Sequence, residues 1–345
     1  MKIIDKFAIV FVHLGDNPSP TLIPFAKFAI RNNPESEFFL ITDSEHRWSD
    51  FPGRIIVSKK RNKSSIKHLI QRSRYNEKIA GGYWVKTYER LFALSNLYGN
   101  IDPNLPIIHI ESDVLLQDAQ ILKEALNIQI DNEIAVPRMS EDLGIASILY
   151  SRNIQCLLTG LKKLDLLGRR NPGICTNDMK LLGLALNQNI ISELPTWSKS
   201  KKDSDIGNKR WLFDGAAIGQ YLFGRDPIHT ENVRLSGYEN PSFPIRPSSL
   251  SWHLEKNIIH ASDGENNYYF ANLHIHSKEI IGHPASELKR WVEILEEANG
   301  VRPRSPSEFV NEEIHTRGYS PLVKLEIFLR TRFKRKNEGK SELNR

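Results

Sequence analysis

The sequence predicts an α/β fold with a mostly parallel central sheet flanked by helices, and two observations support this prediction. Residues 7–12 and 38–42 form short, uninterrupted apolar runs, which are typical of strands buried on both faces. Residues 22–29 between them have apolar side chains at helical spacing, and a third short strand is expected at 54–57. Strands that alternate with helices form parallel sheets, which bind ligands beyond the carboxyl ends of their strands.

Further elements are expected in order along the chain. Thr21 is expected to cap the first helix, and Asp118 to cap a helix over 119–126. Before residue 170, further helices are expected at 84–98 and 154–167, and further strands at 107–110, 133–137 and 147–150. From residue 171 the chain is predicted to be irregular, with ordered islands at 178–186, 211–223 and 268–275. Helices are expected again at 284–298 and after the proline-rich break that follows.

The size and composition suit a soluble globular enzyme. The chain has 345 residues, of which 40% are apolar and 26% are charged. It has no run of roughly 18 uncharged apolar residues, which a membrane span needs, and its charged N-terminus is unlike a signal peptide, so we expect a cytoplasmic protein. We predict a catalytic domain over 1–280 and a helical C-terminal extension over 281–345. Cys156 and Cys175 are expected to be reduced and structural.

The net charge of +6 is concentrated near the end of the chain. Residues 321–345 contain eight Lys or Arg and three Glu, so the rest of the chain is close to neutral. A nearly neutral body lacks the basic face expected of a nucleic-acid-binding domain. Residues 322–336 combine an apolar helix side with five basic residues after it. This favours peripheral contact with an anionic membrane surface at the inner face, and a docked helix with a solvated end is the alternative.

Two carboxylates follow the apolar strand at 107–110. Glu111 and Asp113 lie at positions i and i+2 of an extended chain, so their side chains share a face and can reach one crevice. Carboxylate oxygens are preferred ligands of hard divalent cations, which also bind phosphate oxygens. The alternative is that Asp113 caps a loop and Glu111 is solvated. The motif by itself does not separate the two interpretations.

This strand and its Glu-Ser-Asp ending resemble the metal and nucleotide-sugar motif of GT-A glycosyltransferases, whose fold is a Rossmann-like, mostly parallel sheet flanked by helices. The family motif is usually Asp-x-Asp, and this chain has Glu in the first position. The resemblance implies that Glu111 and Asp113 bind Mn²⁺ or Mg²⁺. It also implies that Ser112 between them belongs to the donor site.

The helix segment 84–92 resembles the one that precedes the acidic motif in bacterial members of the family. A basic side chain there commonly lies against the acidic motif. The resemblance therefore implies this place for Arg90. Lys86, one helical turn earlier, is interpreted as part of a solvated helix face.

A late histidine segment, 272–278, resembles the one that completes the metal site in polysaccharide-synthesis transferases. His274, His276 and Lys278 alternate and so share one face of an extended chain. The resemblance implies that a neutral imidazole binds the cation and that the ammonium of Lys278 meets the diphosphate. His276 is preferred to His274 as the ligand.

Two aspartates are candidates for catalysis, and each has a structural alternative. Residues 211–222 resemble the acceptor-side motif of the family, in which Asp214 would orient an acceptor hydroxyl or take its proton. Asp is also a preferred N-cap, and the small residues after Asp214 permit close packing. Asp178 has the same ambiguity at another helix start, and there the capping interpretation is preferred.

Two residues at the ends of the first two strands are candidates for binding the nucleotide. His13 ends the first apolar run, and Asp43 follows the second. The resemblance implies that this edge holds the base and ribose, and a carboxylate after a strand can accept hydrogen bonds from ribose hydroxyls.

Together these segments predict a metal-dependent glycosyltransferase that uses a nucleotide-sugar donor. The resemblance implies a glycan or a lipid-linked acceptor and a role in cell-surface polysaccharide synthesis. One alternative is a nucleotidyltransferase, but residues 15–18 are a poor version of the glycine-rich, basic loop that such enzymes place after the first strand. The other alternative is a non-catalytic protein of the same fold that binds nucleotides or glycans.

Overall fold

The computed structural model describes residues 6–15, 19, 21–44, 48–58, 83–117, 122, 124, 126, 130–196, 205–206, 209–223, 246–255 and 258–275. The predicted C-terminal extension, its basic tail, the helix at 284–298 and the cap Asp118 lie outside this part of the chain. Within it, no helix has the length and apolar character that crossing a membrane would need.

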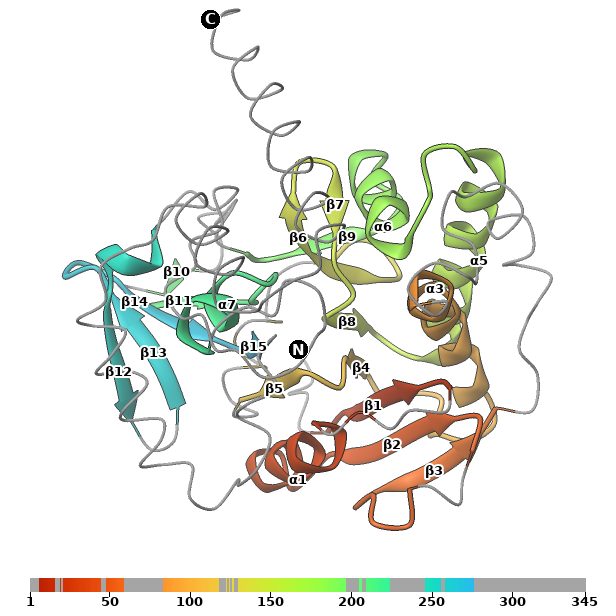
Figure 1. Ribbon diagram of the computed structural model, residues 1–345, viewed down its shortest axis with the longest axis horizontal. Helices are drawn as coiled ribbons and strands as arrows, with labels where there is room; N and C mark the ends of the chain where they lie inside the picture. The colour runs from red at the N-terminus through yellow and green to blue at the C-terminus, as the bar shows by residue number, and fades with distance from the viewer. Residues whose placement is uncertain are drawn as a thin grey trace, which may run out of the picture.

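A central mixed sheet organises the molecule (Figure 1). Its strands, in spatial order, are β3 (Arg54–Val57), β2 (Glu37–Thr42), β1 (Ala8–His13), β4 (Ile107–Ile110), β8 (Ile148–Ser151), β6 (Ala135–Ser140) and β7 (Leu143–Gly144), and β9 (Ser192–Leu194) pairs with β6. The strands from β3 to β4 run parallel. Strand β8 is antiparallel to both β4 and β6, and β9 is parallel to β6. The predicted α/β class with a mostly parallel central sheet is confirmed.

Helices cover both faces of this sheet, because its strands are apolar on both sides. In β1, Ala8, Val10 and Val12 face one apolar cluster, whereas Ile9 and Phe11 face another. The first cluster is completed by α3 (Tyr83–Ala93), the 3₁₀ turn η3 (Leu94–Leu97), α5 (Ile154–Arg170) and α6 (Asp178–Asn187), and the second by α1 (Leu22–Asn32). Each fully buried side chain such as Phe11 contributes roughly 1.5 to 3 kcal/mol.

A second sheet forms from residues that the sequence analysis treated mostly as irregular. Its strands, in spatial order, are β10 (Asp205–Ile206), β11 (Lys209–Leu212), β14 (Asn267–Phe270), β13 (Ile258–Ser262) and β12 (Ser251–Glu255). Its buried face includes Trp252, Ile259 and Phe270, which pack with α7 (Ile218–Phe223). The indole N–H of Trp252 also donates to the carbonyl of Pro247 in the 3₁₀ turn η6 (Pro247–Ser249) at 3.1 Å. The expected ordered islands were correct, but the hairpin of β12 and β13 was missed.

A short two-stranded ladder joins the two sheets (Figure 1). Strand β15 (Asn272–His274) pairs antiparallel with β5 (Val114–Leu116), which follows β4 after a tight turn. The buried side chain of Gln117 then donates to the carbonyl oxygens of Ile259 and Phe270 at 3.1 and 2.7 Å. Its amide oxygen accepts from the N–H of Ile259 at 2.8 Å. The end of β5 is therefore tied to β13 and β14, two inner strands of the second sheet.

The two capping predictions have different outcomes. Thr21 occupies the N-cap position of α1, but its hydroxyl accepts no hydrogen bond from the helix and instead lies 2.7 Å from the hydroxyl of Ser19. Helix α6 begins with Asp178, yet the cap is Asn177, whose side chain accepts from the N–H of Lys180 at 2.8 Å. The capping interpretation of Asp178 was therefore wrong by one residue.

Candidate metal and donor site

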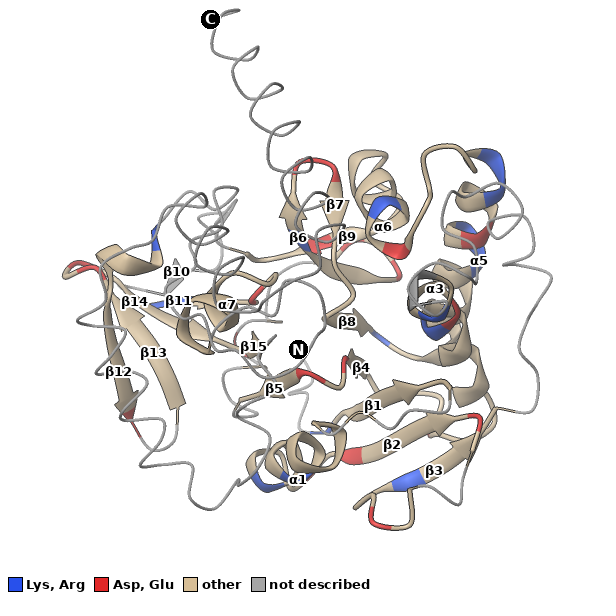
Figure 2. Ribbon diagram, in the orientation of Figure 1, with Lys and Arg blue, Asp and Glu red and all other residues tan. Residues whose placement is uncertain are grey.

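The turn between β4 and β5 delivers two carboxylates to the edge of the central sheet, and it is coloured as acidic in Figure 2. The N–H of Glu111 donates to the carbonyl of Ser147 at 3.0 Å, and the N–H of Val114 donates back to the carbonyl of Glu111 at 3.2 Å. The second bond closes the turn, which has Ser112 and Asp113 at its centre. The side chain of Glu111 is 11% exposed, whereas that of Asp113 is 34% exposed.

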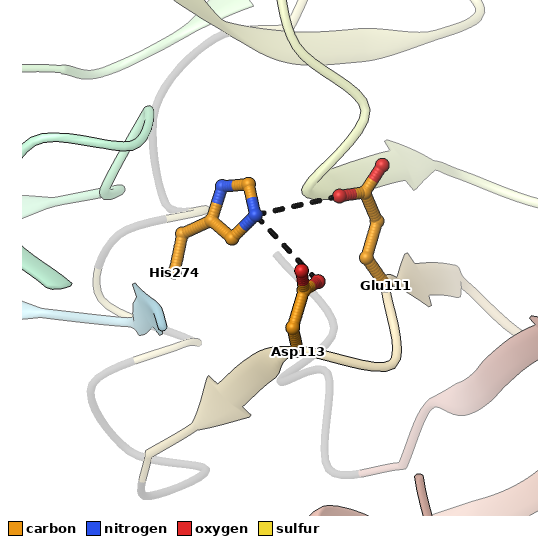
Figure 3. A group of neighbouring side chains, drawn as sticks. All are labelled: Glu111, Asp113 and His274. Carbon is orange, nitrogen blue, oxygen red and sulfur yellow. Dashed lines mark ion pairs between the residues drawn. The ribbon is translucent and has the colours of Figure 1, made fainter. Parts of the chain in front are cut away.

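His274 completes a cluster with these two carboxylates (Figure 3). Strand β15 places His274 opposite Val114, and the next residue, Ile275, donates its N–H to the carbonyl of Asp113 at 2.8 Å. The Nε2 atom of His274 lies 3.5 Å from Oε2 of Glu111 and 3.6 Å from Oδ1 of Asp113. One ligand atom from each of the three side chains lies within 4.8 Å of the other two.

The structure thus brings the acidic pair together with His274, which the sequence analysis had named second to His276. His276 and Lys278 lie outside the described residues, so their predicted roles stay predictions. Alternation could not separate the two histidines, because both lie on the same face of an extended chain. The pairing of β15 with β5 shows which histidine lies at the acidic pair, and this pairing joins residues far apart in the sequence.

The electrostatics of this cluster favour positive charge. Burial acts to lower the pKa of His274, but the charges of Asp113 and Glu111 outweigh it and raise the pKa to about 9. Burial raises the pKa of the Glu111 carboxyl, and the guanidinium of Arg90 opposes this shift only in part. A second histidine below the cluster, His109 on β4, behaves differently: burial and the charge of Arg90 lower its pKa to about 3. His109 is therefore neutral.

Arg90 lies on the other side of Glu111 and forms a buried ion pair with it. Its guanidinium is also 3.8 Å from Asp178, whose carboxylate accepts from the hydroxyl of Thr87 at 3.1 Å. Burial raises the pKa of Asp178, while Arg90 and Thr87 oppose the shift. The predicted contact between Arg90 and the acidic pair is confirmed. Asp178 lies behind Arg90, and its catalytic role stays a prediction.

The carboxylate of Asp214 is occupied by backbone N–H groups. Its Oδ1 accepts from Ala217 and Ile218 at 2.8 and 3.0 Å, and its Oδ2 accepts from Gly219 at 2.7 Å and from His274 at 2.9 Å. The side chain is buried. These contacts favour the capping interpretation, and Asp214 also holds the backbone of His274.

The two predicted nucleotide-binding residues lie at neighbouring strand ends. His13 ends β1, and its ring makes an edge contact with Trp48 at 4.8 Å between centroids. Both carboxylate oxygens of Asp43, after β2, accept from the N–H of Gly15 at 3.1 and 3.0 Å. These residues and Glu111 follow adjacent parallel strands and therefore share one edge of the sheet. Their binding of a base or ribose stays a prediction.

Sequence reasoning missed two residues that approach this edge. Thr87 supports Asp178, and Lys86 extends toward Gly15 instead of lying on a solvated helix face. The spacing of Lys86 and Arg90, one helical turn apart, was the available indication, because side chains at i and i+4 point to the same side of a helix.

The metal-ligating atoms of the cluster fit a divalent cation. Carboxylate oxygens suit Mg²⁺ and Mn²⁺, and a neutral imidazole is a common additional ligand. Ligands bound at about 2.1 Å in octahedral geometry are about 3 Å apart, close to the separations of 3.5 and 3.6 Å from His274 to the two carboxylates. The same two carboxylates raise the pKa of His274, which means that their charge favours a positive group between them.

No protein-family model and no curated protein matches the chain. Similar solved structures include the apo form of the glycosyltransferase GlyE of Streptococcus pneumoniae TIGR4, at 16% identity and a TM-score of 0.36, over 55% of this chain and 45% of that one. The galactosyltransferase LgtC in complex with donor and acceptor sugar analogs matches at 12% identity and a TM-score of 0.41, over 87% of this chain and 98% of that one.

A third similar structure is mouse xyloside xylosyltransferase 1 in its apo form, at 9% identity and a TM-score of 0.35, over 56% of this chain and 86% of that one. The chain spans less than half the length of the two GlyE structures, 45% and 48%. At such identities and TM-scores these likenesses assign neither a family nor an activity to this chain.

Proposed function

We propose that the protein is a metal-dependent glycosyltransferase of the GT-A type, which transfers a sugar from a nucleotide-sugar donor. The observation that carries this proposal is the cluster of Glu111, Asp113 and His274 beyond the carboxyl end of β4. Sheets of this kind bind nucleotides at that edge. The resemblance of the same segments to the GT-A metal and histidine motifs supports the proposal.

In this proposal Glu111, Asp113 and His274 hold Mn²⁺ or Mg²⁺. When bound, the cation supplies positive charge that stabilises a diphosphate leaving group. Arg90 favours the ionised form of Glu111 and orients its carboxylate, because it pairs with that carboxylate in a buried setting. Asp214 fixes the backbone of His274 and so holds the imidazole toward the two carboxylates.

The remaining roles extend the same proposal. His13, Asp43 and Ser112 would bind the nucleotide, and Lys278 would meet the diphosphate. A glycan or lipid-linked acceptor would be used in cell-surface polysaccharide synthesis at the cytoplasmic face of a membrane. The division into a catalytic domain over 1–280 and a helical extension over 281–345, which would contact an anionic membrane surface, belongs to this proposal too.

The test is hydrolysis of a panel of nucleotide sugars by the purified protein, with and without Mn²⁺ or Mg²⁺. We expect metal-dependent release of the nucleoside diphosphate from one donor class. Asp113→Asn should lower the rate at least about 100-fold, because it weakens a cation that contributes several kcal/mol to the transition state. Asp50→Asn, which changes an exposed acid that is not part of the cluster, is the matched control and should keep the wild-type rate.

Two results would refute the proposal. One is hydrolysis that survives Asp113→Asn or needs no metal. The other is the absence of hydrolysis with every donor in the panel. Formation of a nucleotide sugar from a nucleoside triphosphate and a sugar phosphate would instead identify a nucleotidyltransferase.

A further inference from the structure

Lys86 lies in the first half of α3, and its side chain extends to the loop after β1. A Cβ atom added to Gly15 would lie 2.7 Å from Nζ of Lys86 and 3.1 Å from its Cε. Gly15 also has a φ of +110°, which side-chain-bearing residues rarely adopt. The glycine therefore allows the chain to bend there and leaves the space that the ammonium group occupies.

The two basic residues of α3 have different surroundings. Arg90 lies between the carboxylates of Glu111 and Asp178, so its charge is already balanced. Lys86 makes no hydrogen bond or ion pair within the described part of the chain, and its side chain is only partly exposed. An ammonium group held at a strand end without a carboxylate partner is available to an anionic ligand.

The loop that Lys86 approaches is held in place from the other side. Both oxygens of Asp43 accept from the N–H of Gly15, which ties the loop after β1 to the end of β2. The acidic pair follows β4, and β4 is the parallel neighbour of β1. Lys86 is therefore at the same edge of the sheet as the metal cluster, next to Gly15, which has no side chain.

We propose that Lys86 binds the diphosphate of the nucleotide donor, an inference that rests on the proposed function. The ammonium of Lys86 adds a positive charge at this edge, where no described carboxylate pairs with it, and a lysine binds phosphate oxygens as a compact point charge. Lys86 thus determines affinity for the phosphate part of the donor.

The test compares nucleoside diphosphates with the corresponding nucleosides, which lack phosphate. Binding of the uridine, guanosine, adenosine, cytidine and thymidine forms is measured by titration calorimetry with Mn²⁺ present. We expect Lys86→Gln to weaken binding of the preferred diphosphate about 10- to 100-fold and binding of its nucleoside less than about 2-fold, as expected for one lost charge-assisted contact. Lys86→Arg should recover most of the affinity, because it retains the charge. Lys162→Gln, an exposed residue of α5, is the matched control.

The outcomes separate this inference from the function on which it rests. If the wild-type protein binds no nucleoside diphosphate, the proposed function and the role of Lys86 both fail. If it binds one and Lys86→Gln binds it equally well, only the role of Lys86 fails. An equal loss of diphosphate and nucleoside affinity would also overturn it, because that pattern indicates a change in the fold. Thermal unfolding of Lys86→Gln should match the wild type, since Lys86 has no hydrogen-bond or ion-pair partner among the described residues.

Discussion

At the scale of single residues, Arg90 balances the acidic side of the candidate site. Its side chain is 17% exposed, and those of Glu111 and Asp178 are 11% and 5% exposed. Burial raises the pKa of both carboxyls, which means that ionising them inside the protein costs free energy. Arg90 offsets part of this cost for both groups. The Arg90–Glu111 ion pair need not add net stability to the fold, but removing one partner leaves a buried charge uncompensated.

Arg90→Met should therefore lower the free energy of unfolding by about 3 to 5 kcal/mol at neutral pH, measured by urea denaturation. The matched control is Arg169→Met, because Arg169 is 49% exposed and pairs with Asp165 within α5. That change should cost at most about 1 kcal/mol. Equal losses in the two variants would show that Arg90 does not compensate buried carboxylates.

The loss of stability in Arg90→Met should also depend on pH. Without Arg90 the pKa values of Glu111 and Asp178 in the folded state rise further above those of the unfolded chain, which are near 4. The folded state then binds more protons than the unfolded state, so the variant gains stability as the pH falls from about 7 toward about 4 and loses it as the pH rises. The difference in stability between Arg90→Met and the wild type should therefore shrink as the pH falls. A difference that is constant over this range would contradict the assignment.

At the scale of elements, the contact between α7 and β15 decides how His274 is held. Asp214 accepts two N–H bonds at the start of α7 and shares its other oxygen between Gly219 and the backbone of His274. A Cβ added to Gly219 would lie 2.1 Å from the carbonyl oxygen of His274. The helix therefore approaches the strand so closely that a side chain there would displace it.

Asp214→Asn should separate the capping and catalytic interpretations of Asp214. The amide keeps one acceptor oxygen for the start of α7, but its NH₂ group faces the N–H donors of Gly219 or His274. We expect stability to fall by about 1 to 3 kcal/mol, the cost of unsatisfied buried groups, and Mn²⁺ affinity to fall with it. Thermal melting and metal titration measure the two effects. If turnover is lost while both quantities stay at wild-type values, Asp214 acts as a catalytic base instead.

The elements also show what the sequence could and could not predict. The strands β1, β2, β3 and β4 were predicted because each is a short, mostly apolar run, a local pattern that needs no knowledge of its neighbours. The hairpin of β12 and β13 was missed, although its residues alternate between exposed and buried. Its core face depends on pairing with β14 and on Gln117, which is distant in the sequence. Such non-local pairing cannot be deduced from spacing.

At the scale of the whole molecule, the candidate metal site joins two sheets. Glu111 and Asp113 come from the end of the central sheet, and His274 comes from β15, which follows directly after β14 of the second sheet. The acidic pair was predictable because the strand and its acids are adjacent in sequence. The partner histidine was not, since its place depends on how the two sheets are joined. A cation bound at this cluster would hold the sheets to each other as well as bind a donor.

Metal binding should therefore stabilise the whole fold and not only the turn after β4. A cation at 100 times its dissociation constant adds about 2.7 kcal/mol to the free energy of unfolding. Mn²⁺ should raise the melting temperature, EDTA should reverse the rise, and hydrogen exchange should slow in both β5 and β15. His274→Ala should lose most of this stabilisation, whereas the control Asp50→Asn should keep it. If exchange slows in β5 alone, or if His274→Ala responds to Mn²⁺ like the wild type, the cation is bound without His274 and does not join the sheets.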